Sequence, residues 1–174
     1  MRELGPQRGA EELPRHLNRV YDAVIAEVHR YGGSVLSFSG DAVTCWLDDP
    51  SASDAPSASG QAREAGDVAP AGVRAIACGL AIQQVMAQFG AVTTPAGTAF
   101  SLSIKVAAVA GPVRRFLVGD PAIQTIEAIA GQTLDELAAT EQCAERGQVL
   151  VPAGMIEAAG GLVEFEGWRQ GEGT

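Results

Sequence analysis

Residues 31–46 constrain the fold of this chain more than any other stretch. Two short apolar runs, at about residues 34–39 and 42–47, flank the turn sequence Ser39-Gly40-Asp41. Apolar runs of this length on either side of a Gly-Asp turn predict a β-hairpin. Such a hairpin holds the carboxylate of Asp41 at its tip, where a metal ligand or an acid facing a phosphate can be rigidly aimed. The alternative is an ordinary turn, in which Gly-Asp is a common pair.

The composition indicates one folded domain over residues 1–174. A chain of this length can bury a sizeable core. Hydrophobic residues make up 47%, which excludes a wholly disordered chain, and the 5% of aromatic residues predicts an aliphatic, alanine-rich core. The net charge is −9 and Lys105 is the only lysine. We therefore expect no nucleic acid as a partner, because its phosphates need clustered Lys and Arg.

The cysteines and the N-terminus indicate a cytoplasmic protein. Cys45, Cys78 and Cys143 are widely spaced and form no CxxC pattern, which is typical of the free thiols of a reduced protein. The N-terminal residues are polar and lack the apolar core of a signal peptide. No apolar run approaches the roughly 18 residues that a membrane span needs, so we expect no membrane contact.

An amphipathic helix is predicted before the hairpin. Its apolar residues recur at spacings of three and four, at Leu13, Leu17, Val20, Val24 and Val28. Pro14 fits the first turn of this helix, where a missing N–H has no cost, and Gly32-Gly33 fits its end.

Residues 48–72 are rich in Pro, Ser, Ala, Gly and Asp, and are predicted to be a disordered insertion. The elements expected after it are a helix at 73–89, a loop at 90–98, strands at 102–110 and 116–118, helices at 120–130 and 133–143, a strand at 149–151, a helix at 152–159 and a strand at 162–168. Asp120 and Pro121 suit the N-cap and first position of one helix, and Thr133 with Glu136 suits a capping box on the next. This order predicts an α+β fold.

In order and spacing these segments resemble the catalytic domain of class III adenylate and guanylate cyclases. The resemblance rests on residues 9–18, 31–33, 38–42, 77–86, 102–106, 116–120 and 145–151. It covers nearly all of residues 9–168 outside the insertion, and is closest to the soluble, bicarbonate-responsive adenylyl cyclases. It implies a cyclase fold related to the ferredoxin-like fold, with a mixed, mostly antiparallel sheet and helices packed on one side.

The resemblance also implies a metal site and a nucleotide site. Cyclases of this class act as dimers with ATP or GTP at the interface, and two aspartates hold two Mg²⁺ or Mn²⁺ ions. Asp41 matches the second of these aspartates. The first lies on a strand upstream of the first helix, so we expect that strand to be missing. Ser37 and Phe116 match the purine-reading pair, a lysine and an Asp or Thr, and both positions are substituted.

The residues that stabilise the transition state are also substituted. In the class, an asparagine and an arginine follow the glycine of the fourth strand by four and eight residues. With Gly119 as that glycine, the two places hold Ile123 and Glu127, which cannot neutralise a transferring phosphate. We therefore predict no retained catalytic residue, with Asp41 alone left of the site.

Two hypotheses follow from the resemblance. The chain is a nucleotidyl cyclase that turns ATP into cAMP and pyrophosphate, weak or inactive as this chain alone, and works as a homodimer or with a second cyclase domain. Alternatively, it is a catalytically degenerate module that serves dimerisation or regulation. Under either hypothesis, a sheet edge left open by the missing strand predicts association with another chain.

Overall fold

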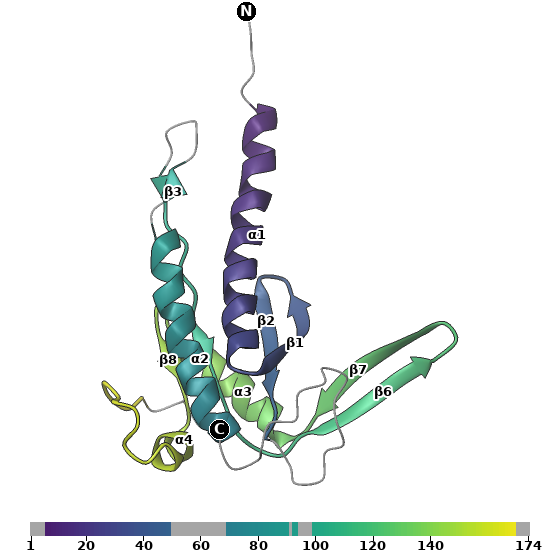
Figure 1. Ribbon diagram of the computed structural model, residues 1–174, viewed down its shortest axis with the longest axis vertical. Helices are drawn as coiled ribbons and strands as arrows, with labels where there is room; N and C mark the ends of the chain where they lie inside the picture. Colours follow the sequence, from purple (N-terminus) through teal and green to yellow (C-terminus); the bar gives the residue numbers. More distant parts are fainter. Residues whose placement is uncertain (1–5, 50–68, 91, 94–98, 170–174) are drawn as a thin grey trace, which may run out of the picture.

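The computed structural model describes residues 6–49, 69–90, 92–93 and 99–169, and its α+β class confirms the prediction (Figure 1). The elements are α1 (Pro6–Arg30), β1 (Gly33–Ser39), β2 (Ala42–Leu47), α2 (Ala71–Met86), the 3-10 helix η1 (Ala87–Phe89), β3 (Val92–Thr93), β4 (Ala99–Phe100), β5 (Val106–Ala107), β6 (Arg114–Asp120), β7 (Gln124–Ala130), α3 (Gln132–Cys143), β8 (Val149–Leu150) and α4 (Ala153–Ala158). The predicted insertion at 48–72 lies mostly outside the described residues, and its last two residues already belong to α2.

The described strands pair two by two. β1–β2, β3–β4 and β6–β7 are antiparallel, and β5–β8 is parallel. The mostly antiparallel pairing is as predicted, but these strands form four separate two-stranded sheets instead of one continuous sheet. The strand expected at 102–110 is reduced to β5, and the one expected at 162–168 is absent from the described residues. Within the described residues, segment 102–110 has a strand partner only at β5, where β8 lies alongside, and segment 162–168 has none.

Helices α1 and α2 pack side by side and form the main core (Figure 1). Its buried residues are Val20, Val24, Val28, Cys78, Ile82, Met86 and Phe89. The three valines belong to the predicted apolar stripe, and each fully buried side chain of this size contributes about 1.5–3 kcal/mol. Cys45 of β2 and three residues of the 102–106 segment cover this core from the strand side.

Helix α1 begins earlier than predicted. It starts at Pro6, so Pro14 lies inside the helix and not in its first turn. The fixed φ of proline is helical, and the helix continues through Pro14 at the cost of one backbone hydrogen bond. The predicted end is confirmed, because α1 stops at Arg30 and Gly32 follows with φ +75°.

Arg74 of α2 gathers three separate segments. Its guanidinium donates to the carbonyl oxygens of Tyr31 at 2.8 Å and Ala69 at 2.9 Å, and also to that of Asp48. Asp48 and Ala69 lie close to either side of residues 50–68, so this one side chain holds the two flanks of that stretch against the end of α1.

Candidate functional site: two hairpins

The β1–β2 hairpin presents Asp41 as predicted. Ser39 pairs with Ala42 across a two-residue connection, and Gly40 takes φ +62°, a conformation that glycine adopts without strain. On the helix side, the ring of Phe38 meets Tyr21 of α1 edge to face at 5.7 Å between centroids, which fixes the hairpin to the helix. Asp41 is exposed at the tip. The hairpin is confirmed, and the metal-binding role of Asp41 stays a prediction.

Ser37 lies on the hairpin face that is turned away from α1. It pairs with Thr44, and Ser34 pairs with Trp46, so these residues share one face opposite Phe38. A register shift between Val35 and Ser37 marks a bulge that precedes Ser37. The purine-contacting role of this position remains a prediction, and the hydroxyl is exposed.

Trp46 joins this face to the second hairpin, β6–β7. The guanidinium carbon of Arg115 lies 5.9 Å from the centroid of the indole ring, a cation–π distance. The indole Nε1 is buried and has no hydrogen-bond partner within the described part of the chain. No local sequence pattern predicts this contact, because it joins two hairpins nearly seventy residues apart.

The β6–β7 hairpin replaces the helix predicted at 120–130, and this prediction was wrong. Asp120 does not cap a helix: its carboxylate accepts the N–H of Ala122 at 2.9 Å, and its carbonyl accepts the N–H of Ile123 at 2.9 Å. The same short side chain that can cap a helix can also close a turn. Pairing of β7 with β6 decides for the turn over the helix cap. β-branched residues such as Ile126 favour this strand pairing.

Phe116 belongs to an exposed apolar face of this hairpin. It pairs with Ala128, and Val118 pairs with Ile126, so the four side chains share one face. Phe116 is 47% exposed, Val118 57% and Ile126 62%. Since neighbouring residues of a strand point to opposite faces, Phe116 points away from the side on which Arg115 meets Trp46. The structure thus places Ser37 and Phe116 on faces that do not converge.

The hairpin also carries a shallow pocket of about 350 Å³. Arg115, Phe116, Leu117 and Glu127 line it. Arg115 and Glu127 form an ion pair across the strands, so the cation of the pocket is neutralised by its neighbour. A triphosphate would meet no net positive charge here.

The described residues bring no set of three metal-ligating side chains together. They contain no group of three or more His, Cys, Asp or Glu side chains that could hold a metal ion. Divalent ions such as Mg²⁺ are bound by several oxygen ligands at once. The binding of such an ion by Asp41 stays a prediction.

Helix α3 begins after Gly131, so the helix expected directly after Gly119 is not formed there. The glycine that precedes a helix after these strands is Gly131, the N-cap of α3, and not Gly119. Counting four and eight residues from Gly131 gives Asp135 and Ala139. Ile123 and Glu127, the residues predicted for these places, lie instead in the hairpin connection and on β7. With either glycine, no asparagine or arginine occupies these places.

The predicted capping box at the start of α3 is also absent. Thr133 does not cap this helix; its hydroxyl donates to the carbonyl of Pro112 at 2.9 Å. The carbonyl of Pro112, in the segment before β6, therefore binds the hydroxyl that a capping box would use.

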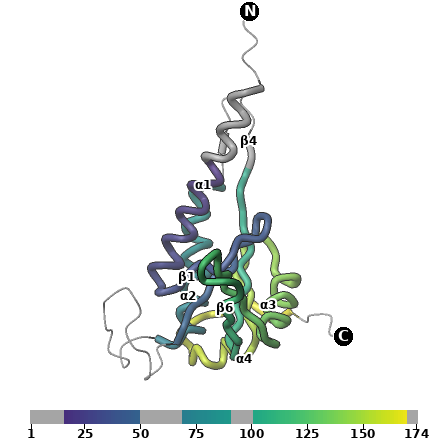
Figure 2. The backbone as a smooth tube through the Cα atoms, turned by 90° about the vertical axis from the view of Figure 1, so that its right-hand side faces the viewer, coloured from purple at the N-terminus to yellow at the C-terminus, as the bar shows by residue number. Residues whose placement is uncertain are grey.

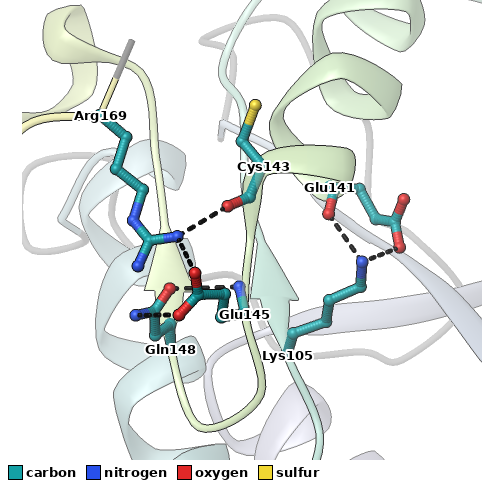
Figure 3. Close-up of polar contacts among 6 residues, drawn as sticks. All are labelled: Lys105, Glu141, Cys143, Glu145, Gln148 and Arg169. Carbon is teal, nitrogen blue, oxygen red and sulfur yellow. Dashed lines mark hydrogen bonds and ion pairs between the residues drawn. The ribbon is translucent and has the colours of Figure 1, made fainter. Parts of the chain in front are cut away.

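Two side-chain cations near the end of α3, Lys105 and Arg169, form hydrogen bonds and ion pairs within the chain (Figure 3). Lys105 donates to the carbonyl of Glu141 at 2.9 Å and pairs with its carboxylate at 2.8 Å. Arg169 donates to the carbonyl of Cys143 at 3.2 Å and pairs with Glu145 at 2.8 Å. Positive charge is favourable at a helix C-terminus. The hydrogen bond from Arg169, together with its charge, lowers the pKa of Glu145.

The thiols are free, as predicted, and burial makes two of them, Cys45 and Cys78, poor nucleophiles. Cys45, Cys78 and Cys143 are not in disulfides. Burial raises the pKa of Cys78 to about 11, and burial also raises the pKa of Cys45. Because the thiolate is the reactive form, neither is suited to nucleophilic catalysis.

Together, the helical pair, the hairpins and α3 have the fold of guanylyl and adenylyl cyclase domains. One similar solved structure is the guanylyl cyclase Cya2, with a TM-score of 0.68 and 23% identity over 95% of this chain and 76% of that one. Another is the guanylate cyclase domain of RhGC from Catenaria anguillulae in complex with GTP, with a TM-score of 0.62 and 19% identity over 87% and 71%. A third is the adenylyl cyclase CyaB from P. aeruginosa, with a TM-score of 0.59 and 19% identity over 91% and 71%.

At these identities the likeness is one of fold. No protein-family model and no curated protein matches the sequence. None of the helices that the structure describes is long and apolar enough to cross a membrane.

Proposed function

We propose that the chain is a nucleotidyl cyclase domain of the class III type, related to the soluble, bicarbonate-responsive adenylyl cyclases. Its reaction would be the conversion of ATP into cAMP and pyrophosphate, weak or absent with this chain alone. The cyclase fold, with Asp41 exposed at the tip of the β1–β2 hairpin, is the observation that supports this proposal. The proposal places the protein in the cytoplasm, in cyclic-nucleotide signalling.

In this proposal, metal ions would stabilise the reacting phosphates only if a second carboxylate joined Asp41 as a ligand. Mg²⁺ or Mn²⁺ neutralises the triphosphate and the leaving pyrophosphate in such reactions. In this chain Asp41 would be one ligand of the ion. A second carboxylate from a partner subunit or another polypeptide segment is needed to complete the ligand set.

The second candidate function is a degenerate module that acts by dimerisation or regulation. The apolar face of β6–β7 favours it, because this hairpin projects from the rest of the chain (Figures 1 and 2) and leaves Phe116, Val118 and Ile126 exposed on one face. We propose a homodimer, or a pair with a second cyclase domain, in which this face is buried. The substitutions at Ser37 and Phe116 also favour this candidate.

Turnover separates the two candidates. Purified chain is incubated with ATP or GTP and Mn²⁺, and cAMP or cGMP is measured beside the Asp41→Ala variant. The proposal predicts little or no product from the chain alone, and any product formed should fall with Asp41→Ala. Robust turnover that is unchanged in Asp41→Ala would overturn the assignment of Asp41. Robust turnover that Asp41→Ala abolishes would overturn the degenerate-module candidate.

A further inference from the structure

Three hydrogen bonds tie the two ends of the β1–β2 hairpin to the start of α2. Arg74 donates from Nη1 to the carbonyl oxygen of Tyr31, two residues before β1, at 2.8 Å, and from Nη2 to that of Asp48, just after β2. The carboxylate of the next residue, Asp49, accepts the N–H of Ala71. Within the described residues, α2 makes no other hydrogen bond to this hairpin or its ends.

The first turn of α2 depends on Asp49 for its cap. Pro70 stands at the N-cap position, and no side chain next to it in the sequence caps the helix. The N–H groups of a first helical turn have no partner within the helix, so the carboxylate of Asp49 satisfies one of them from across the fold. A negative charge is also favourable at this end of a helix. This one bond therefore holds the exit of β2 and the first turn of α2 together.

Arg74 binds the same junction with its whole guanidinium. Its Nε donates to the carbonyl oxygen of Ala69 at 2.9 Å, so all three nitrogens are bound to carbonyl oxygens. A guanidinium presents its donors in fixed directions, which a lysine ammonium cannot reproduce. A Cβ on Gly32 would lie 3.0 Å from Nη1. The glycine at this position therefore leaves the guanidinium room beside the end of α1.

Apolar contacts hold the rest of the hairpin to the helices. Phe38 meets Tyr21 of α1 edge to face, yet Phe38 is 56% exposed. Cys45 of β2 packs against the α1–α2 core, which contains Cys78. Burial, and after it the nearby Cys45 thiol, raises the pKa of Cys78. A hairpin of two strands is marginally stable by itself, so its attachment to the helices decides how often it opens.

We propose that Arg74 and Asp49 form a latch, and that release of this latch lets the β1–β2 hairpin open from the α1–α2 core as one local unit. Parts of a fold that are held by few contacts open at a lower free energy than the whole chain unfolds. Opening exposes Cys45 and Cys78 and moves Asp41 together with the hairpin. The latch acts in the same way whether or not the chain is a cyclase, so it does not rest on the proposed function.

The native thiols report this opening. The full chain is treated with iodoacetamide at pH 8, and the alkylation rate of each cysteine is measured by mass spectrometry of its peptide. We expect Arg74→Ala to raise the rate at Cys45 by about tenfold or more, because a covered thiol reacts only when its segment opens. Arg74→Lys keeps the charge but not the three directed donors, and should raise the rate as well. The rate at Cys143, at the end of α3, should not change.

Two glycine variants provide a matched control. Gly32 and Gly160 both have a positive φ, +75° and +59°, so alanine strains the backbone at either position. The new Cβ would crowd Arg74 at Gly32 but has nothing within 4 Å at Gly160. Gly32→Ala should therefore raise the rate at Cys45 severalfold, and Gly160→Ala should leave it unchanged. Equal rates in these two variants, or a parental rate at Cys45 in folded Arg74→Lys, would overturn the proposal.

Discussion

Two glycines of α2 differ in what a side chain would meet. A Cβ on Gly79 would lie 2.9 Å from Cγ1 of Val149 and 3.2 Å from Cγ1 of Val106, whereas one on Gly72 would have only ordinary contacts at 3.6 Å. We predict that Gly79→Ala destabilises the fold by about 1–3 kcal/mol through overpacking. Gly72→Ala should instead be neutral, or stabilising by up to about 1 kcal/mol. Urea unfolding of both variants checks this, and equal effects would contradict the α2–β8 packing.

Cys78 predicts a specific pH dependence. Its pKa is about 11 in the folded chain, against 9.0 for an ordinary thiol. Alkylation of native Cys78 should therefore be slow at pH 8 and rise only toward pH 11, because the thiolate is the nucleophile. Between pH 9 and 11 the unfolded chain binds fewer protons than the folded one, so this thiol lowers stability as the pH rises. Rapid alkylation of folded chain at pH 8 would contradict its burial.

Single residues show where prediction from sequence succeeds. Asp41 could be placed at a hairpin tip because turn chemistry and the flanking apolar runs agree locally. Asp120 could not be placed, because an aspartate before a proline suits both a helix cap and a turn. Strand pairing with residues 114–119 decided the matter, and no local pattern reports such pairing.

At the scale of elements, the two long helices and the local β1–β2 ladder were predictable, and the ladders β5–β8 and β6–β7 were not. The stripe from Val20 to Val28 identifies α1 because its period alone specifies a helix face. The segment at 102–110 alternates like a strand, but the ladder formed only at β5, where β8 supplies a partner. An alternating pattern indicates which face of a strand is buried, but it does not indicate which other strand pairs with it.

The β6–β7 hairpin gives a prediction about association. An isolated two-stranded hairpin is marginally stable in water, and this one exposes Val118 and Ile126 on one face. If this face is the dimer surface, Val118→Asp and Ile126→Asp should shift the chain from dimer to monomer in light scattering. Leu117→Asp, on the opposite face and 78% exposed, is the control and should leave the mass unchanged. A monomeric parent chain, or equal effects of the three changes, would count against this surface.

At the scale of the whole molecule, the fold and the residues expected at the site lead to different expectations about activity. The chain has the fold of cyclase domains, and the resemblance in sequence predicts Asp41, exposed at the tip of the β1–β2 hairpin, as a metal ligand. At the positions that the resemblance predicts for the other groups, the sequence has different residues. Arg115, Lys105 and Arg169 are all engaged in ion pairs. We propose that this chain alone has the cyclase fold without a complete two-metal site.

The binding of Mn²⁺ in the presence of ATP tests this account most directly. Free Mn²⁺ is followed by electron paramagnetic resonance while it is titrated into the chain and into Asp41→Asn. Beyond the ions that ATP binds by itself, we predict at most one weakly held ion per chain, and weaker binding still in Asp41→Asn, because a single carboxylate leaves most ligand positions to water. Two tightly bound ions per chain, lost together in Asp41→Asn, would contradict it.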